Sequence, residues 1–149
     1  MITIATARAA ADLSEGLVLA TVEVKAPPER VFRALASEEV TRWWVRPGVF
    51  DTRRWSGDVR RGGRWRASGI GGGKPYDLEG DFTEVDAPRR LVHTWRLAGA
   101  ESECAYLLEP VDGGTRVTLR HSGLASRPAC ANTCIGWETS FEELARMLG

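Results

Sequence analysis

Five segments in which apolar and polar residues alternate occupy the middle of this 149-residue chain. They cover residues 64–69, 76–85, 90–97, 102–110 and 115–122. Alternation puts every second side chain on one face of a β-strand, so each segment predicts a strand with one buried face. The connections between the segments are short and rich in Gly, Pro and Asp, which is typical of hairpins. The chain is therefore expected to build an antiparallel sheet.

The flanking regions predict one more strand and three helices. β-Branched residues such as Val22 and Val24 favour a strand over residues 17–25. Pro28 and Glu29 suit the first turn of a helix, and Ser37 is expected to cap a second short helix. Residues 128–148 carry apolar side chains near helical spacing. Residues 49–63 are expected to be irregular with at most one short strand, and residues 5–13 to be helical or loose.

The apolar face of the sheet must be covered, and the C-terminal helix is the only predicted element long enough to do so. Arg64 and Arg66 alternate with inward residues and are expected to pair with Asp77, Glu79 and Asp81 of the next strand. The inward set is Trp65, Ala67, Tyr76, Leu78, Gly80, Phe82, Leu91, His93, Trp95, Cys104, Tyr106, Leu108, Val117, Leu119 and His121.

Six tryptophans are spread over most of these elements, at positions 43, 44, 55, 65, 95 and 137. Rings of this size are usually at least partly buried. If most of them point inward, the domain either packs very tightly or encloses a cavity. The second arrangement would make the protein a binder of small molecules.

Charge and cysteine content exclude several classes of protein. Twenty basic residues balance twenty acidic ones, so no overall field favours nucleic acid or anionic lipid. Three cysteines without regular spacing argue against a disulfide framework. The first sixteen residues contain no apolar run of signal-peptide or membrane-span length. We therefore expect a cytoplasmic protein that is neither secreted nor inserted into a membrane.

Seven short motifs occur in order along residues 17–148. They are APPERVFRAL (26–35), RWW (42–44), GGRW (62–65), RLVHTW (90–95), GGTR (113–116), HSG (121–123) and GWE (136–138). Together they resemble the START and Bet v-like (SRPBCC) superfamily, and within it the group related to the activator of the heat-shock-protein-90 ATPase. The resemblance covers a domain at residues 17–149 and leaves residues 1–16 as an N-terminal extension.

The resemblance implies an α+β helix-grip fold. In this fold a curved antiparallel sheet of about six or seven strands wraps around a long C-terminal helix, and two short helices follow the first strand. A cavity commonly lies between sheet and helix. The candidate ligand-binding residues are therefore Trp43, Trp44, Trp65, Tyr76, Phe82, His93, Trp95, Tyr106, His121, Trp137 and Phe141.

Packing competes with ligand binding at several of these positions. Helix-on-sheet packing explains Trp65, Trp95 and Trp137 more simply than ligand stacking does. His93 stands where relatives usually have an aromatic ring, which makes it the better candidate for a role specific to this protein. His121 belongs to a common family motif and is expected to tie its strand end to the following loop.

The sequence favours binding of a hydrophobic or aromatic small molecule, such as a lipid, without cofactor or catalysis. One alternative is a chaperone accessory of the stress response that uses its outer surface. Another is an aromatase- or cyclase-like enzyme with proton transfer through His93, Tyr106 or Glu138. With any of these functions the protein is expected to be a monomer or a homodimer.

Two further clusters are expected to be structural. Cys130 and Cys134 share a helix face and could hold zinc with a histidine, but the fourth ligand is missing and packing is the simpler interpretation. No metal site is therefore predicted. Basic residues at 53, 54, 60, 61, 64 and 66 stand among acids and predict a solvated face with ion pairs.

Overall fold

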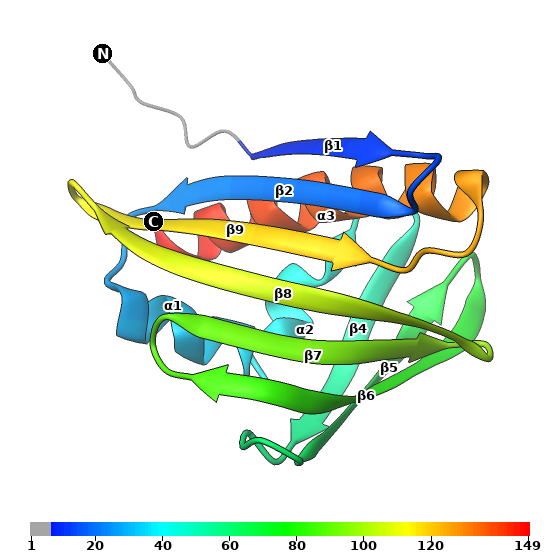
Figure 1. Ribbon diagram of the computed structural model, residues 1–149, viewed down its shortest axis with the longest axis horizontal. Coiled ribbons are helices and arrows are strands. Elements are labelled where there is room, and N and C mark those ends of the chain that lie inside the picture. The colour runs from blue at the N-terminus through cyan, green and yellow to red at the C-terminus, as the bar shows by residue number, and fades with distance from the viewer. Residues whose placement is uncertain (1–6) are drawn as a thin grey trace.

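A curled antiparallel sheet of nine strands wraps around one long helix in the computed structural model, which describes residues 7–149 (Figure 1). The order across the sheet is β1-β2-β9-β8-β7-β6-β5-β4-β3. The strands are β1 (Arg8–Asp12), β2 (Leu17–Val24), β3 (Val45–Arg46), β4 (Phe50–Gly57), β5 (Arg64–Gly71), β6 (Lys74–Asp86), β7 (Arg90–Leu97), β8 (Ala100–Val111) and β9 (Gly114–Ser122). This architecture is the helix-grip fold, with more strands than the six or seven expected.

Three helices complete the fold: α1 (Pro28–Leu35), α2 (Val40–Trp43) and α3 (Arg127–Leu148). Pro28 begins α1, as expected from its fixed φ angle, and Glu29 lies in the first turn. The cap expected at Ser37 is wrong, because α2 begins only at Val40 with Glu39 as its N-cap residue. Ser37 lies two residues earlier, where its Oγ accepts a hydrogen bond from the backbone N–H of Glu39 at 3.2 Å.

The expectation for residues 5–13 is wrong where the structure describes them, because Arg8–Asp12 forms strand β1. This strand has no alternation of apolar and polar residues, and it pairs with β2 along the sheet edge through its backbone. Residues 5 and 6 lie outside the described part. The division of the chain at residue 16 remains a prediction, although β1 continues the same sheet as β2.

The segment expected to be irregular contains an eight-residue strand, β4. A bulge between Thr52 and Arg54 interrupts its pairing with β5. Thr52 and Trp55 are therefore both buried although they lie three residues apart. A spacing of three hides the period of two by which a strand is recognised in a sequence.

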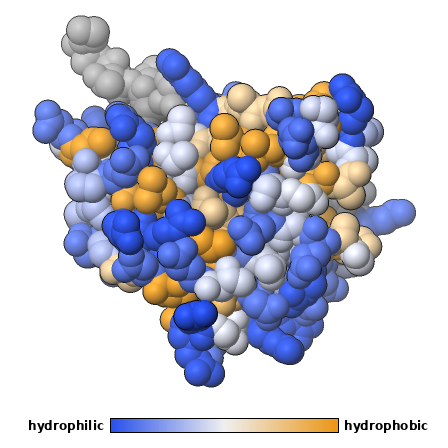
Figure 2. Space-filling model, in the orientation of Figure 1, coloured by the Kyte–Doolittle hydropathy of each residue, from blue (hydrophilic) through white to orange (hydrophobic). Residues whose placement is uncertain are grey.

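The core lies between the concave face of the sheet and the three helices, and alternation identified its sheet side correctly. Leu91, Tyr106 and Leu119 are fully buried, and Tyr76 and Trp95 are half-buried. On the outer face, Arg64 and Arg96 both pair with Asp81, at 3.6 and 2.8 Å. Figure 2 shows that hydrophilic residues surround several separate apolar areas on this outer face.

Candidate functional site

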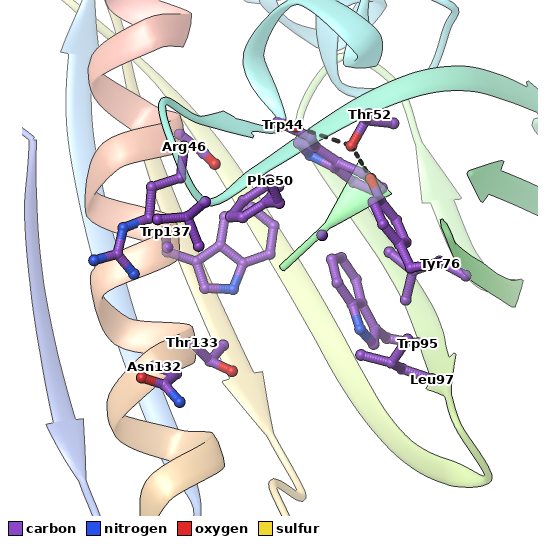
Figure 3. Close-up of a pocket in the computed structure, with 15 residues that line it drawn as sticks. Trp44, Arg46, Phe50, Thr52, Tyr76, Trp95, Leu97, Asn132, Thr133 and Trp137 are labelled. Carbon is purple, nitrogen blue, oxygen red and sulfur yellow. Dashed lines mark hydrogen bonds between the residues drawn. The ribbon is translucent and has the colours of Figure 1, made fainter. Parts of the chain in front are cut away.

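A pocket of about 460 Å³ lies between the concave face of the sheet and α3 (Figure 3). Its size falls within the roughly 300–1,000 Å³ of typical small-molecule sites. Residues of β4, β6, β7 and α3 and of the connection after α2 supply most of its wall. The full lining is Trp44, Arg46, Val49, Phe50, Thr52, Gly71, Tyr76, Leu78, Trp95, Leu97, Asn132, Thr133, Gly136, Trp137 and Ser140.

Helical periodicity explains the wall that α3 contributes. Thr133, Gly136, Trp137 and Ser140 follow one another at steps of three, one and three residues, which puts them on one face of the helix. Gly136 leaves the space in front of the helix open. A Cβ atom added there would find its nearest neighbour, Phe50 Cε1, only at 3.8 Å.

Three indole rings form a continuous aromatic surface beside the pocket. The ring centroid of Trp95 lies 5.1 Å from that of Trp44 and 5.8 Å from that of Trp137. Trp95 comes from β7, Trp44 follows α2 and Trp137 comes from α3. The pocket therefore offers ring faces and edges suited to stacking with a flat apolar molecule.

A short hydrogen-bonded chain forms a polar point in this wall. The Thr52 hydroxyl donates to the backbone carbonyl of Trp44 at 2.8 Å. The hydroxyl of Tyr76 makes a close hydrogen bond with Thr52 Oγ1 (Figure 3). Burial raises the pKa of Tyr76 above its ordinary value, so the phenol stays neutral at physiological pH.

Four of the residues predicted to bind ligand line the pocket: Trp44, Tyr76, Trp95 and Trp137. The other seven lie in the buried layer around it. They are Trp43, Trp65, Phe82, His93, Tyr106, His121 and Phe141. Ring contacts join the two layers, for example between Trp44 and Trp65 with centroids 5.5 Å apart. Whether any of the eleven residues contacts a ligand stays a prediction.

His121 holds Trp137 in place from behind the pocket wall. The indole N–H of Trp137 donates to His121 Nδ1 at 2.9 Å. An indole nitrogen can only donate, so the imidazole hydrogen is on Nε2, which donates to Ser102 Oγ at 2.7 Å. Burial, and secondarily His93, lower the pKa of His121 to about 3. His121 thus links β9 to α3 and β8 instead of to the following loop.

His93 is enclosed by aromatic rings, with its centroid 5.0 Å from Trp65 and 5.9 Å from Tyr106. Its Nδ1 lies 3.0 Å from the carbonyl oxygen of Thr94, which also accepts a hydrogen bond from Trp65 Nε1 at 3.1 Å. Burial lowers the pKa of His93 to about 4. His93 is therefore a neutral core group at physiological pH.

Tyr106 and Trp44 each carry a polar atom that is buried in the core. Within the described part of the chain, neither the Tyr106 hydroxyl nor Trp44 Nε1 makes a hydrogen bond of good geometry. Burial raises the pKa of Tyr106 well above its ordinary value, and the nearby indole N–H of Trp44 acts in the opposite direction. The residues named for proton transfer, His93, Tyr106 and Glu138, do not line the pocket.

Several lining residues were missed by the sequence prediction. Phe50 and Thr52 belong to β4, whose bulge conceals its pattern. Thr133, Gly136 and Ser140 could have been found, because they lie one helical turn or one residue from Trp137 on the predicted helix. Small or polar residues next to an inward tryptophan on the same helix face indicate the side of α3 that lines the pocket.

The cysteines and arginines have structural contacts. The buried thiol of Cys130 points to the backbone oxygens of Asp12 and Leu17, at 3.7 and 3.6 Å, and so connects α3 to the β1–β2 turn. Arg53 pairs with Asp51 and Arg60 with Asp58, as expected for a solvated face with ion pairs. Among residues 7–149 no group of three or more His, Cys, Asp or Glu side chains could hold a metal ion.

No helix in the described range is both long and apolar enough to cross a membrane.

Several solved structures of other proteins are similar to this one. Among solved structures, protein CV1439 from Chromobacterium violaceum is 24% identical with a TM-score of 0.80, over 89% of this chain and 96% of that chain. Ms6760 from Mycobacterium smegmatis is 23% identical with a TM-score of 0.80, over 97% of both chains. These two likenesses show the shared fold. The AHSA1 protein from Silicibacter pomeroyi is 25% identical with a TM-score of 0.74, over 89% of this chain and 96% of that chain.

No curated protein matches the sequence significantly. A family model, described as "Activator of Hsp90 ATPase homolog 1-like protein", matches residues 25–149. The match spans most of the chain and every element from α1 to α3. The chain therefore belongs to the family of Activator of Hsp90 ATPase homolog 1-like proteins.

Proposed function

We propose that this protein binds an apolar, aromatic small molecule in the pocket between the sheet and α3. The observation that carries the proposal is the open volume of about 460 Å³ walled by Trp44, Trp95 and Trp137. A pocket of this size accommodates a molecule of two or three fused rings, and an apolar wall favours its transfer from water.

The charge of the lining supports a neutral or weakly polar ligand. Among the described residues that line the pocket, Arg46 is the only charged one. Its guanidinium lies out over α3, away from the rings of Tyr76 and Trp95 (Figure 3). The inner part of the pocket is therefore neutral, and burial of a charged group there would be costly.

A fluorescent probe tests the proposal. N-Phenyl-1-naphthylamine emits strongly only in apolar surroundings, so titration into the protein should give a saturable increase in emission with one site per chain. The variant Gly136→Leu places a side chain in the open space before α3 and should abolish the increase. Leucine is a good helix former, so circular dichroism should show an intact fold.

A matched control separates the pocket from other aromatic surfaces. Trp55 is buried on β4 but does not line the pocket, so Trp55→Phe should bind the probe as the wild type does. Equal emission from the wild type and Gly136→Leu would contradict the proposal. That result would favour the family's other candidate role, a chaperone accessory that acts through its outer surface.

A further inference from the structure

The hydrogen atoms of the polar chain beside the pocket can be assigned from chemistry. The backbone carbonyl of Trp44 can only accept, so the single hydroxyl hydrogen of Thr52 is directed to it, over 2.8 Å. The contact between Thr52 Oγ1 and the Tyr76 hydroxyl then needs a hydrogen from Tyr76. Tyr76 is therefore the donor in this contact, and its own hydrogen is not available to a ligand.

The oxygen of Tyr76 can still accept a hydrogen bond, and the Tyr76 side chain lines the pocket. Resting on the proposed function, we propose that the pocket selects aromatic ligands with a hydrogen-bond donor, a phenolic O–H or an N–H, at the end that reaches Tyr76. Ligands that present an ether or carbonyl oxygen there meet an acceptor with no hydrogen to offer. The class of ligand is thus a neutral phenol or aromatic amine.

The position of Tyr76 makes this selection directional. Figure 3 shows Asn132 and Thr133 at one end of the pocket and Tyr76 with Thr52 at the other. Most of the other lining residues are apolar, including Trp95, Leu78 and Trp137. An oxygen acceptor placed beside Tyr76 would lose its water without gaining a partner, which weakens binding.

The Tyr76 phenol remains neutral over the range in which binding would be measured, because burial raises its pKa. Thr52, which fixes the direction of the hydrogen bond, is 4% exposed. Bulk water therefore competes little for its hydroxyl, and the hydrogen-bond direction is set by protein groups.

Three probes of one ring system test the inference by isothermal titration calorimetry. Naphthalene measures the apolar pocket alone, 2-naphthol adds a donor, and 2-methoxynaphthalene replaces the donor with an acceptor. The wild type should bind 2-naphthol about tenfold more tightly than 2-methoxynaphthalene, as expected for one buried hydrogen bond gained and one acceptor left unpaired.

Two variants show whether Tyr76 and its hydrogen are responsible. Thr52→Val keeps the shape of the side chain but removes the acceptor for Tyr76, which frees the phenolic hydrogen. This variant should lose the preference for 2-naphthol and gain affinity for 2-methoxynaphthalene. Tyr76→Phe should bind all three probes with similar affinity, and the thermal unfolding of both variants confirms that they are folded.

The outcomes distinguish this inference from the proposed function. Binding of all three probes by the wild type with equal affinity, or a preference that Thr52→Val leaves unchanged, would overturn the donor selection and leave the apolar site in place. Failure of every probe, naphthalene included, would overturn both proposals together.

Discussion

The two histidines show how burial changes the role of a residue type often associated with catalysis. Both are neutral at physiological pH because burial lowers the pKa of His93 to about 4 and that of His121 to about 3. His121 keeps Trp137 in its orientation through a hydrogen bond of 2.9 Å. At the residue scale, the histidines therefore support the pocket wall from behind.

Stability should fall as the pH decreases from about 6.5 to 4.5. In the unfolded chain each histidine takes up a proton near its ordinary pKa of 6.5, whereas in the folded chain it does so only below about 4. The unfolded state thus binds more protons in this window, and each histidine lowers the free energy of unfolding by about 1.4 kcal/mol per pH unit below 6.5. Urea unfolding at several pH values measures the slope.

The titratable groups near the two histidines do not titrate in the folded protein between pH 6.5 and 4.5. Burial raises the pKa of Cys104 and Tyr106 well above their ordinary values, so both stay neutral throughout. Asp81 has a lowered pKa, caused first by its hydrogen bond from Arg96, and loses its contribution only at more acidic pH. The variant His93→Phe should reduce the slope by about half, and an unchanged slope would refute the assignment.

At the scale of the elements, α3 carries one wall of the pocket and depends on the way its first turn is capped. Ser126 precedes the helix with extended backbone, and its Oγ accepts a hydrogen bond from the N–H of Ala129 at 3.2 Å. This arrangement satisfies one of the free N–H groups of the first turn. The cap thus fixes the helix end from which Asn132 and Thr133 reach the pocket.

Replacement of the cap should destabilise the protein by a defined amount. Ser126→Ala removes the acceptor and should lower the free energy of unfolding by about 1 kcal/mol. Ser126→Asp supplies another acceptor and a charge that suits the helix N-terminus, so it should retain or exceed the wild-type stability. Equal losses in both variants by urea denaturation would show that the hydroxyl contributes by packing instead.

At the scale of the whole molecule, the sequence predicted the sheet better than the pocket. Alternation identified the inward residues of β5 to β9 because these residues keep a spacing of two, and the irregularity of β6 comes only after Phe82. The same reasoning failed for β4, whose bulge brings Thr52 inward, and for β1, which has no apolar pattern. β4 supplies Phe50 and Thr52 to the pocket. Because the pattern of this strand was not recognised, its contribution to the pocket wall was not predicted either.

The buried layer explains why many aromatic candidates do not reach the pocket. The alternation of apolar and polar residues predicts which side of the sheet a ring occupies. It placed Trp65, His93 and Tyr106 correctly on the concave face. How deeply each ring is buried depends on how α2 and α3 cover this face, and that is determined only in the assembled fold. Trp95 remains half-buried and open to the pocket, whereas Trp65, on the same face, is enclosed.

The most direct test of the binding proposal uses the indole N–H resonances of the six tryptophans in a ¹⁵N-labelled sample. Titration with naphthalene should shift the signals of Trp44, Trp95 and Trp137, which line the pocket, and leave that of Trp55 unchanged. Single Trp→Phe variants assign each signal. Saturable shifts confined to the three pocket tryptophans are the predicted result; no shifts, or shifts led by Trp55, would contradict a ligand site between the sheet and α3.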